Sequence, residues 1–389
     1  MTTNTVKVKS IEFKGEIKGR GVVCYGSSDK NNHNRYCGKN YEYIQHDNYK
    51  LAACEWKKRP DGDGYHKFPI ITSECLRFAT TEDELGFRQT NNVLYNHELT
   101  IKYMSSLPAL TKGYLFAKEG LKSKSNFHLT DAVDDGNAIL KFDIHTRSGY
   151  KDTSTKGIDD SSDTTMYYRE TCGATRYTFE GSISDINELR FRSMSTIFDR
   201  ASIKIEHAGA IREGLKNNIA AYAKTVTDAK IGDTGDISEI GFYNKSGSAY
   251  DISELGFCLN DEQLRVLIHY ILTRIASIRI TKTTGGFAVV SEMQVRVITS
   301  PVKTAIDGDD GWITVKVAKK MPDMSFLNGL VFDDRYQFDS EGKYKEDAHT
   351  DAVKTRNAEA AAKNAIKREE KAAKKAENEA KKKAKTVES

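Results

Sequence analysis

A long alternating segment near the N-terminus predicts the first strand. Between residues 6 and 21 apolar and polar positions alternate with a period of two, with one phase slip near Ser10, and glycines close the run. Such alternation is typical of a strand with one buried and one polar face. The polar positions of this strand carry several cations, namely Lys7, Lys9, Lys14, Lys18 and Arg20.

Helical spacing is clearest between residues 259 and 278. Asn260 or Asp261 can cap this segment, and Gln263 completes a capping-box pattern with Asn260. A wide apolar stripe follows, formed by Leu264, Leu267, Ile268, Ile271, Leu272 and Ile275. Residues 208–226 also show helical spacing, so the sequence predicts at least two amphipathic helices.

Further strands and one more helix alternate along the body of the chain. Residues 72–92 are predicted to be helical, residues 174–184 and 188–206 to be strands, residues 99–117 to mix strand and turn, and residues 279–298 to form a glycine turn and a strand. Interleaved helices and strands predict an α+β fold. Long insertions with little periodicity interrupt this core, at about residues 26–68, 147–174 and 226–257.

The C-terminal part differs in composition from the core at residues 1–300. After a C-terminal extension at residues 301–345, residues 346–389 are dominated by Ala, Lys and Glu. Pairs such as Glu359 and Lys363, four residues apart in an Ala-rich sequence, favour a single exposed, charged helix. The composition leaves open whether this tail is a solvated helix or a contact for nucleic acid or a partner.

The tail carries the basic excess of the chain. The formal net charge is +4, but the first 353 residues hold 47 basic and 49 acidic residues. A site for a polyanion in the body must therefore be a local patch. No apolar run approaches the roughly 18 to 20 residues of a membrane helix, and the N-terminus has no apolar signal region, so we expect a cytoplasmic protein without membrane contact.

The six cysteines are scattered and form no CxxC pair, which favours reduced thiols. Cys24, Cys37 and Cys54 share a segment with His33 and His46, but their spacing fits no standard zinc pattern. The chain also lacks the motifs of P-loop, Rossmann, zincin and hydrolase sites. The sequence thus predicts no metal, no cofactor and no catalytic residue.

The acidic loops and the histidines do not change this interpretation. Asp131, Asp134 and Asp135 could hold magnesium, but a turn built from Asp and Gly is the better interpretation, and the loop lacks the bidentate glutamate of an EF-hand. His128 and His269 stand beside no evident nucleophile or carboxylate partner. We expect them to be ordinary surface or half-buried histidines.

The segment PIITSECLRFAT, residues 69–80, has the features of a phosphate site. Thr72 and Ser73 stand at a predicted helix start, where free N–H groups and the helix dipole favour an anion. Arg77 lies one turn further along, on the same face as Ser73. The simpler alternative is that Ser73 caps the helix and Arg77 is a solvated charge, and the residues alone leave both open.

This segment also resembles a family signature. ITSECLR is similar to the pattern ISSQ-x-x-[KR] of the backbone subunit of CRISPR Cascade complexes, a guide-RNA-binding protein of the RAMP superfamily. The similarity is closest to the minimal type I-F variant and covers about residues 6–295. Four further stretches match in the same order: residues 9–23, 113–135, 179–203 and 259–290.

The resemblance implies an RRM-like (ferredoxin-like) core with large inserted thumb and finger loops. Such subunits polymerise along the guide RNA, hold its phosphate backbone and present its bases for pairing with a target, which we expect to be DNA. The implied protein is non-catalytic. Its implied partners are the guide RNA, the target nucleic acid, copies of itself in a helical filament and the other subunits that cap that filament.

Position by position, the resemblance assigns RNA contacts to residues of this chain. Ser73 and Arg77 would touch the guide backbone. The other expected contacts are Tyr25 and Ser27 after the first strand, Lys122 and Lys124 in a basic loop, and Arg176, Lys282, Gly286 and Phe287. Glu74 replaces the usual glutamine of the signature and Phe78 stands where many members have a second basic residue, which predicts a weaker phosphate grip.

Two alternatives from other functional classes remain open. The chain could be a RAMP-type endoribonuclease, for which Asp131, Asp134 and Asp135 would be the only credible cleavage acids. It could also be a self-assembling structural protein in which the basic residues serve subunit contacts. The exact CRISPR subtype also remains open.

Overall fold

The computed structural model describes most of the body of the chain. The ranges are residues 7–25, 49–50, 52–58, 65–80, 97–116, 121–123, 125–148, 164–193, 208–243, 253–282, 285–300, 303–304, 311–315, 323–333, 337–338 and 344–345. The predicted tail helix at residues 346–389 lies outside them.

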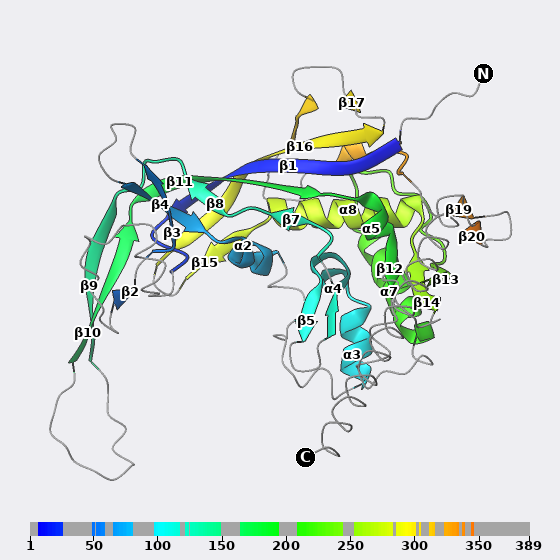
Figure 1. The fold of residues 1–389 in the computed structure, drawn as a ribbon, viewed down its shortest axis with the longest axis horizontal. Helices are drawn as coiled ribbons and strands as arrows, with labels where there is room; N and C mark the ends of the chain where they lie inside the picture. Colours follow the sequence, from blue (N-terminus) through cyan, green and yellow to red (C-terminus); the bar gives the residue numbers. More distant parts are fainter. Residues whose placement is uncertain are drawn as a thin grey trace, which may run out of the picture.

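A ten-stranded sheet, in which every strand pairing is antiparallel, forms the centre of the molecule (Figure 1). Its main path runs β15–β16–β1–β11–β8–β4–β3, with β17 and β18 paired to β16 and β7 paired to β11. The strands are β1 (Lys7–Arg20), β3 (Cys54–Lys58), β4 (Tyr65–Ile71), β7 (His128–Leu129), β8 (Ala132–Asp134), β11 (Ala174–Ile183), β15 (Arg279–Thr281), β16 (Phe287–Ser300), β17 (Lys303–Thr304) and β18 (Ile313–Val315).

Smaller sheets project from the large one. A ribbon of β9 and β10 hangs from one end of the sheet in Figure 1, and β12, β13 and β14 hang from the other. Their strands are β2 (Tyr49–Lys50), β9 (Leu140–Ser148) and β10 (Thr164–Cys172); β12 (Phe191–Ser193), β13 (Ser238–Tyr243) and β14 (Ser253–Cys258); β5 (Tyr114–Phe116) and β6 (Leu121–Ser123); and β19 (Gln337–Phe338) and β20 (Tyr344–Lys345).

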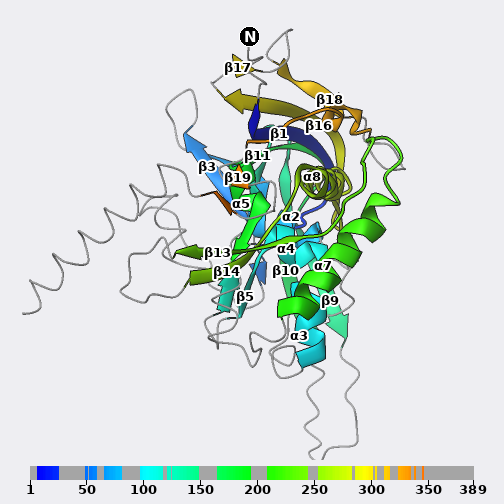
Figure 2. The same ribbon diagram turned by 90° about the vertical axis from the view of Figure 1, so that its right-hand side faces the viewer.

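The helices gather on one side of the large sheet. In Figure 2, α8 is seen end-on beneath β1 and β16, with α7 and α3 further from the sheet. The helices are α2 (Ser73–Ala79), α3 (His97–Met104), α4 (Leu107–Lys112), α5 (Ile186–Arg190), α7 (Ala208–Ala223) and α8 (Asp261–Ala276), with a 3₁₀ turn η4 (Ser325–Leu327). The predicted α+β composition is therefore confirmed as a mixed fold with a large antiparallel sheet.

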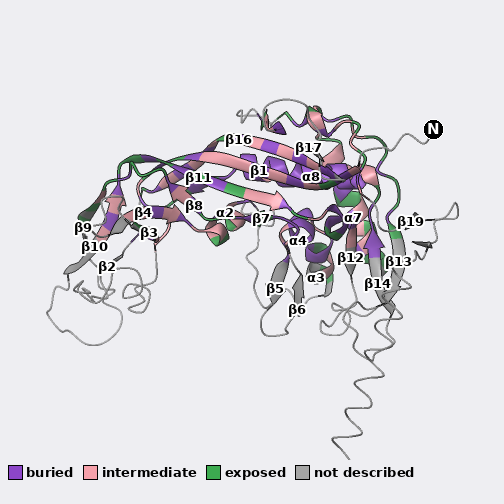
Figure 3. Cartoon of the chain, turned by 45° about the horizontal axis from the view of Figure 1, so that its top comes forward, coloured by how far each residue is buried: buried purple, intermediate pink, exposed green. Residues whose placement is uncertain are grey.

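Strand β1 is an interior strand of the sheet, since β11 pairs with one of its edges and β16 with the other. Ile11, Phe13 and Ile17 are fully buried in the core between sheet and helices. The phase slip predicted near Ser10 is a register shift between Val8 and Ser10 in the pairing with β16. Figure 3 colours the strands of the large sheet by burial, and β1 contains both buried and partly exposed residues. From Ile11 on, the buried positions lie an even number of residues apart, as a period of two requires: Ile11, Phe13, Ile17 and Gly19.

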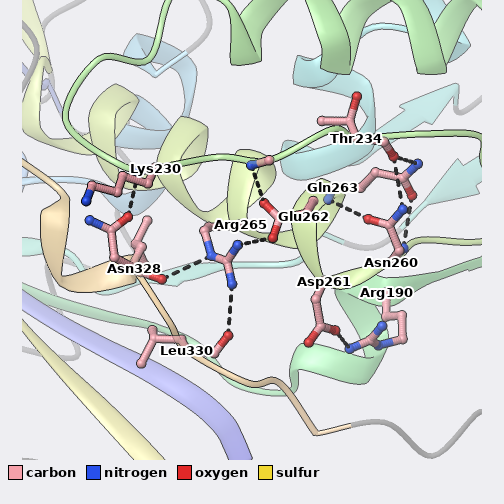
Figure 4. A network of polar contacts seen from close by, with 12 residues as sticks. Arg190, Lys230, Thr234, Asn260, Asp261, Glu262, Gln263, Arg265, Asn328 and Leu330 are labelled. Carbon is pink, nitrogen blue, oxygen red and sulfur yellow. Dashed lines mark hydrogen bonds and ion pairs between the residues drawn. The ribbon is translucent and has the colours of Figure 1, made fainter.

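The central helix α8 is buried along nearly its whole length because it packs against the sheet on one side and other helices on the other. The predicted capping box is present. The Asn260 side chain accepts a hydrogen bond from the Gln263 N–H at 2.9 Å, and the Gln263 side chain accepts one from the Asn260 N–H at 3.0 Å. Polar side chains at this end of α8 also bind loops far away in sequence (Figure 4).

In that network, Arg265 of α8 bonds to the segment at residues 323–333. Its side chain is only 8% exposed, and it donates hydrogen bonds to the carbonyl oxygens of Leu327 and Leu330, each at 3.0 Å, and to Glu262. Residues 331–333 in turn lie parallel to the start of β1, where the N–H of Val8 donates to the carbonyl oxygen of Val331 and the N–H of Asp333 donates to that of Val8. This part of the predicted C-terminal extension therefore shares the main core.

Several local predictions were wrong. Residues 99–117 contain the helices α3 and α4 and the start of β5 in place of a mixture of strand and turn. α4 has a Ser106 N-cap, a proline in its first turn and Gly113 at its end with φ of 73°. Residues 188–206 continue α5 before the three-residue strand β12, and the described part of the predicted helix at 72–92 ends at Ala79.

The three expected insertions contain regular structure. The first includes β2, β3 and most of β4, of which β3 and β4 extend the large sheet. The second includes the end of β9 and all of β10, and the third includes β13 and most of β14. The expected division of the chain into core, insertions, extension and tail stays a prediction.

Candidate nucleic-acid interface

Three segments far apart in sequence meet at one end of β1. They are the segment after β1, the start of α2 and the turn between β15 and β16. The Cys24 thiol receives hydrogen bonds from the Cys75 thiol and from the N–H and hydroxyl of Thr72, and lies near the Lys282 ammonium; together these lower its pKa to about 6 against the opposing effect of burial. The expected contacts Tyr25, Ser73 and Lys282 thus come from segments that touch.

The glycine turn is closed by its own backbone. The Lys282 N–H donates to the carbonyl oxygen of Gly286 at 2.8 Å, and the Gly285 N–H donates to that of Lys282 at 2.9 Å. A Cβ at Gly286 would lie 2.5 Å from the carbonyl oxygen of Val22, so glycine is needed for the turn to pack against the segment after β1. This packing explains the glycine, and its expected approach to RNA stays a prediction.

Lys282 itself is exposed, and Phe287 next to the turn is partly buried. The Arg279 guanidinium lies over the Phe287 ring, 5.7 Å from its centre. A cation and an aromatic ring are thus adjacent beside the turn, which is the combination that single-stranded nucleic acids bind.

A hollow of about 530 Å³ lies beside this junction. Arg20, Tyr25 and Gly285 line one side of it, and Lys141 and Arg169 from the β9–β10 ribbon line the other. Asp143 is the acidic residue in the lining. The volume is in the range of small-ligand sites, and the cations outnumber the carboxylate, so the hollow can accept an anionic group.

Helix α2 begins at Ser73, and Thr72, not Ser73, is its N-cap. The Thr72 hydroxyl accepts a hydrogen bond from the Cys75 N–H at 3.4 Å, and Asp131 accepts one from the Ser73 N–H at 2.7 Å. The helix start therefore already has a carboxylate of its own chain at the place where an anion was expected. Contact between RNA and Ser73 stays a prediction, and it would have to involve the hydroxyl.

Arg77 lies one turn along α2 and is half-buried. Its Nε atom is buried and makes no hydrogen bond within the described ranges. The far end of the helix is held by Arg274 of α8, whose Nε donates to the carbonyl oxygen of Thr80 at 2.6 Å. Both ends of α2 are therefore fixed by residues from distant parts of the chain.

Arg176 lies apart from this junction, on the face of the sheet away from α8. Its side chain is 61% exposed, and its guanidinium is 3.6 Å from Glu16. Lys18 lies directly opposite Arg176 in the register of β1 and β11, and Arg20 is one step further along that face. An exposed ion pair contributes little stability, so Arg176 is available to a partner.

Of the remaining expected contacts, Lys122 is in β6 and only its backbone is described. Ser27 and Lys124 lie outside the described residues. Sequence reasoning overlooked Lys112 at the end of α4, whose ammonium lies 5.2 Å from the centre of the Phe78 ring. The available signal was a lysine in the last turn of SLPALTKG, a segment that the prediction did not recognise as a helix.

Comparison with known families agrees with the resemblance of the ITSECLR segment. The family model described as type I-Fv CRISPR-associated protein Cas7fv-like matches residues 7–307. The chain belongs to the Cas7fv-like family. No curated protein matches the chain.

Solved structures similar to this Cas7fv-like protein come from CRISPR complexes. A chain of "CRISPR RNA-guided surveillance complex, pre-nicking" is 9% identical with a TM-score of 0.35, over 90% of this chain and 99% of that one. A chain of "CRISPR RNA-guided surveillance complex" is 11% identical with a TM-score of 0.33, over 78% and 77%. A chain of "Cryo-EM structure of the Type III-B Cmr-beta bound to cognate target RNA" is 13% identical with a TM-score of 0.24, over 49% and 51%.

The acidic residues considered for catalysis hold structure in this Cas7fv-like protein. Asp134 is buried and accepts hydrogen bonds from the Thr175 hydroxyl and from the N–H groups of Gly136 and Ala138. Asp135 accepts the N–H of Asn137 at 3.1 Å, so the predicted Asp and Gly turn is confirmed. Within the described ranges, no group of three His, Cys, Asp or Glu is placed to hold a metal ion.

His269 was predicted to lack a carboxylate partner, and this is wrong. It is fully buried in α8, where its Nε2 lies 3.1 Å from a carboxylate oxygen of Asp228 and its Nδ1 lies 3.1 Å from the Tyr222 hydroxyl. Burial lowers the pKa of His269 despite the carboxylate, which favours the neutral ring. Asp228 also accepts the Met324 N–H, so the cluster joins α7, α8 and residues 323–333. His128 is exposed on β7.

The pKa values of the cysteine thiols differ with their surroundings. None of the described cysteines forms a disulfide, namely Cys24, Cys54, Cys75, Cys172 and Cys258, and Cys37 lies outside the described residues. Burial raises the pKa of Cys54 to about 12, so Cys24 and Cys54 are at opposite ends of the reactivity range.

None of the described helices is long and apolar enough to cross a membrane.

Proposed function

We propose that this Cas7fv-like protein is the non-catalytic backbone subunit of a CRISPR effector complex, which polymerises along the guide RNA. Membership of the family supports this role. The observation that carries it is that the segments of Tyr25, Ser73 and Lys282 meet at one end of β1, where Cys24 contacts Thr72 and Cys75 and Gly286 packs on Val22. A hollow lined by Tyr25, Gly285 and several cations lies beside this junction. Tyr25, Ser73 and Lys282 are separated by up to 257 positions in sequence, and the fold brings their segments into contact.

The order of the elements supports an RRM-like core for this subunit. The chain runs β1, α2, β8, β11, α8 and β16, which is a βαββαβ sequence. Along the sheet these strands are arranged β16–β1–β11–β8, with the first strand inside and the last beside it. We assign residues 1–300 to this RNA-binding core with its thumb and finger insertions, and residues 301–345 to an extension.

RNA would follow the cations of this surface. Arg77, Lys122 and Lys124 would hold phosphates, and Tyr25 and Phe287 would contact sugars or bases. Ser27, Ser73, Arg176, Lys282 and Gly286 complete the proposed contact set. Such contacts read backbone and shape, and leave sequence to base pairing with the target, which we propose is DNA. The charged tail at 346–389 would bind RNA or a neighbouring subunit.

The partners of this role are the guide RNA, further copies of the chain and capping subunits. The direct test is to express the protein with and without a repeat-spacer transcript, digest with nuclease and sequence the RNA that stays bound. Protection of the spacer in fragments that lengthen by a constant increment is the expected result. Absence of protected RNA would instead favour a self-assembling protein that does not bind nucleic acid.

Two variants separate RNA binding from catalysis. Arg77→Ala is expected to weaken binding to all RNA sequences about equally and to flatten its salt dependence, because a phosphate contact carries no sequence information. A loss confined to some sequences would contradict this. The wild type and Asp131→Ala should both leave bound RNA uncut; cleavage by the wild type that Asp131→Ala abolishes would establish an endoribonuclease.

A further inference from the structure

An exposed aromatic ring on α2 is covered by a lysine from another helix. Phe78 is 50% exposed, and with Ile139 and Val331 it is one of three exposed large hydrophobic side chains among the described residues. The Lys112 ammonium lies 5.2 Å from the centre of its ring, within the range of a cation–π contact. Lys112 is in the last turn of α4, 34 positions further along the chain.

A second cation lies beside this pair. Arg77 precedes Phe78 on α2, and it is close enough for its charge, after the larger effect of burial, to lower the pKa of Lys112. The buried Nε of Arg77 makes no hydrogen bond within the described part of the chain. Two cations from different helices are therefore close together, an arrangement that can hold a phosphate by charge-assisted hydrogen bonds.

The helices that carry these side chains are fixed independently of any ligand. α2 is held by Asp131 at its start and by Arg274 at its end. The Ser106 side chain caps α4, and all residues of α4 before Lys112 are buried. The geometry of the two cations and the ring is therefore a property of the folded chain.

From this arrangement we infer that Arg77, Lys112 and Phe78 form a subsite for one nucleotide of single-stranded RNA. The two cations bind a phosphate and the exposed part of the Phe78 ring stacks on a base. The inference rests on the proposed function and adds a residue to it. Lys112 supplies a cation at Phe78, so the weak phosphate grip predicted from the sequence is no longer expected here.

The test uses the full chain and two short probes, an oligouridine RNA and an abasic oligonucleotide of the same length. Lys112→Ala should weaken binding of both probes about tenfold and reduce the slope of log K against log salt by about 0.7. Phe78→Ala should weaken binding of oligouridine about fivefold or more, leave the abasic probe unaffected and keep the slope. Lys102→Ala, an exposed lysine on α3, is the matched control and should change neither.

Moving the positive charge from position 112 to position 78 separates an effect of charge from an effect on folding. Since the Lys112 ammonium lies over the ring at position 78, the double variant Lys112→Ala/Phe78→Lys should recover the salt slope of the wild type. Lys112→Gln, which keeps most of the side-chain length, should behave like Lys112→Ala if charge is the cause. Thermal melts of each variant confirm that the fold is retained.

The outcomes distinguish the inference from the proposed function. A wild-type protein that binds neither probe would overturn the proposed function. A wild-type protein that binds RNA, with Lys112→Ala equal to it in affinity and slope, would overturn the subsite and leave the function intact. Equal weakening of both probes by Phe78→Ala would show that the ring supports the fold and does not stack on a base.

Discussion

Replacing Arg265 by methionine tests whether α8 holds residues 323–333 against the core. Methionine keeps much of the apolar volume but removes the guanidinium, which donates to the carbonyl oxygens of Leu327 and Leu330 at 3.0 Å each. Each hydrogen bond from a charged donor contributes about 1.5–3 kcal/mol to stability. Loss of the buried contacts is therefore expected to lower the free energy of unfolding by about 3–5 kcal/mol.

Urea unfolding followed by tryptophan fluorescence measures this loss, and a thermal melt should show a decrease of about 4 to 8 °C in a chain of this size. Hydrogen exchange gives a local readout, because the N–H groups of Val8 and Asp333 bond across the same contact and should exchange faster. Lys224→Met, which removes an exposed cation just after α7, is the control and should have little effect. If Arg265→Met lowered the free energy of unfolding by less than about 1 kcal/mol, the reasoning would be refuted, because breaking a buried charged network is expected to destabilise the fold by more.

Three further predictions concern the candidate interface. Gly286→Ala should destabilise the protein by about 1–3 kcal/mol, because its Cβ would meet a backbone carbonyl oxygen at 2.5 Å, whereas Gly173→Ala meets no atom within 4 Å and should be neutral in urea unfolding. Asp131→Ala should cost about 1–2 kcal/mol in the same assay through the lost bond to the first N–H of α2, and Asp131→Asn should cost less; equal losses would argue against that bond. The rate at which iodoacetamide alkylates Cys24 should rise with pH with a midpoint near 6, because alkylation requires the thiolate. Cys75→Ala should move this midpoint upward. An unchanged midpoint would show that the Cys75 thiol does not lower the pKa of Cys24.

Local patterns predicted the long regular elements well. β1 and α8 are long, strongly periodic and bounded by glycines or a capping box, so the sequence predicted them together with the register slip near Ser10. α3 and α4 are only eight and six residues long, which leaves too few turns for a helical period to stand out from a strand-like apolar run. Their positions depend on packing against α7 and α8, which no local pattern contains.

The candidate site depends even more on long-range contacts. The resemblance named Ser73 and Arg77, but it could not show that Asp131 already accepts the N–H at the helix start, since that partner is 58 positions away. Likewise, Phe78 suggested a missing cation because Lys112 is remote in sequence and near only in the fold. Local sequence patterns therefore could not anticipate the partners Asp131 and Lys112, which come from other elements and change the charge around α2.

In the proposed role, in which many copies of the chain bind one long RNA, a fixed α2 has an energetic consequence. The cost of ordering a side chain on binding, about 0.5–1.5 kcal/mol for each immobilised long side chain, would recur at every copy along the guide. Asp131 and Arg274 anchor the two ends of α2 before any RNA is bound. Arg77 and Phe78 are therefore held close to one position. Most of the conformational entropy of these side chains is lost when the chain folds and not when RNA binds. Such a site gains affinity from preorganisation, so its strength need not come from a large number of cations, which agrees with a body whose net charge is close to zero.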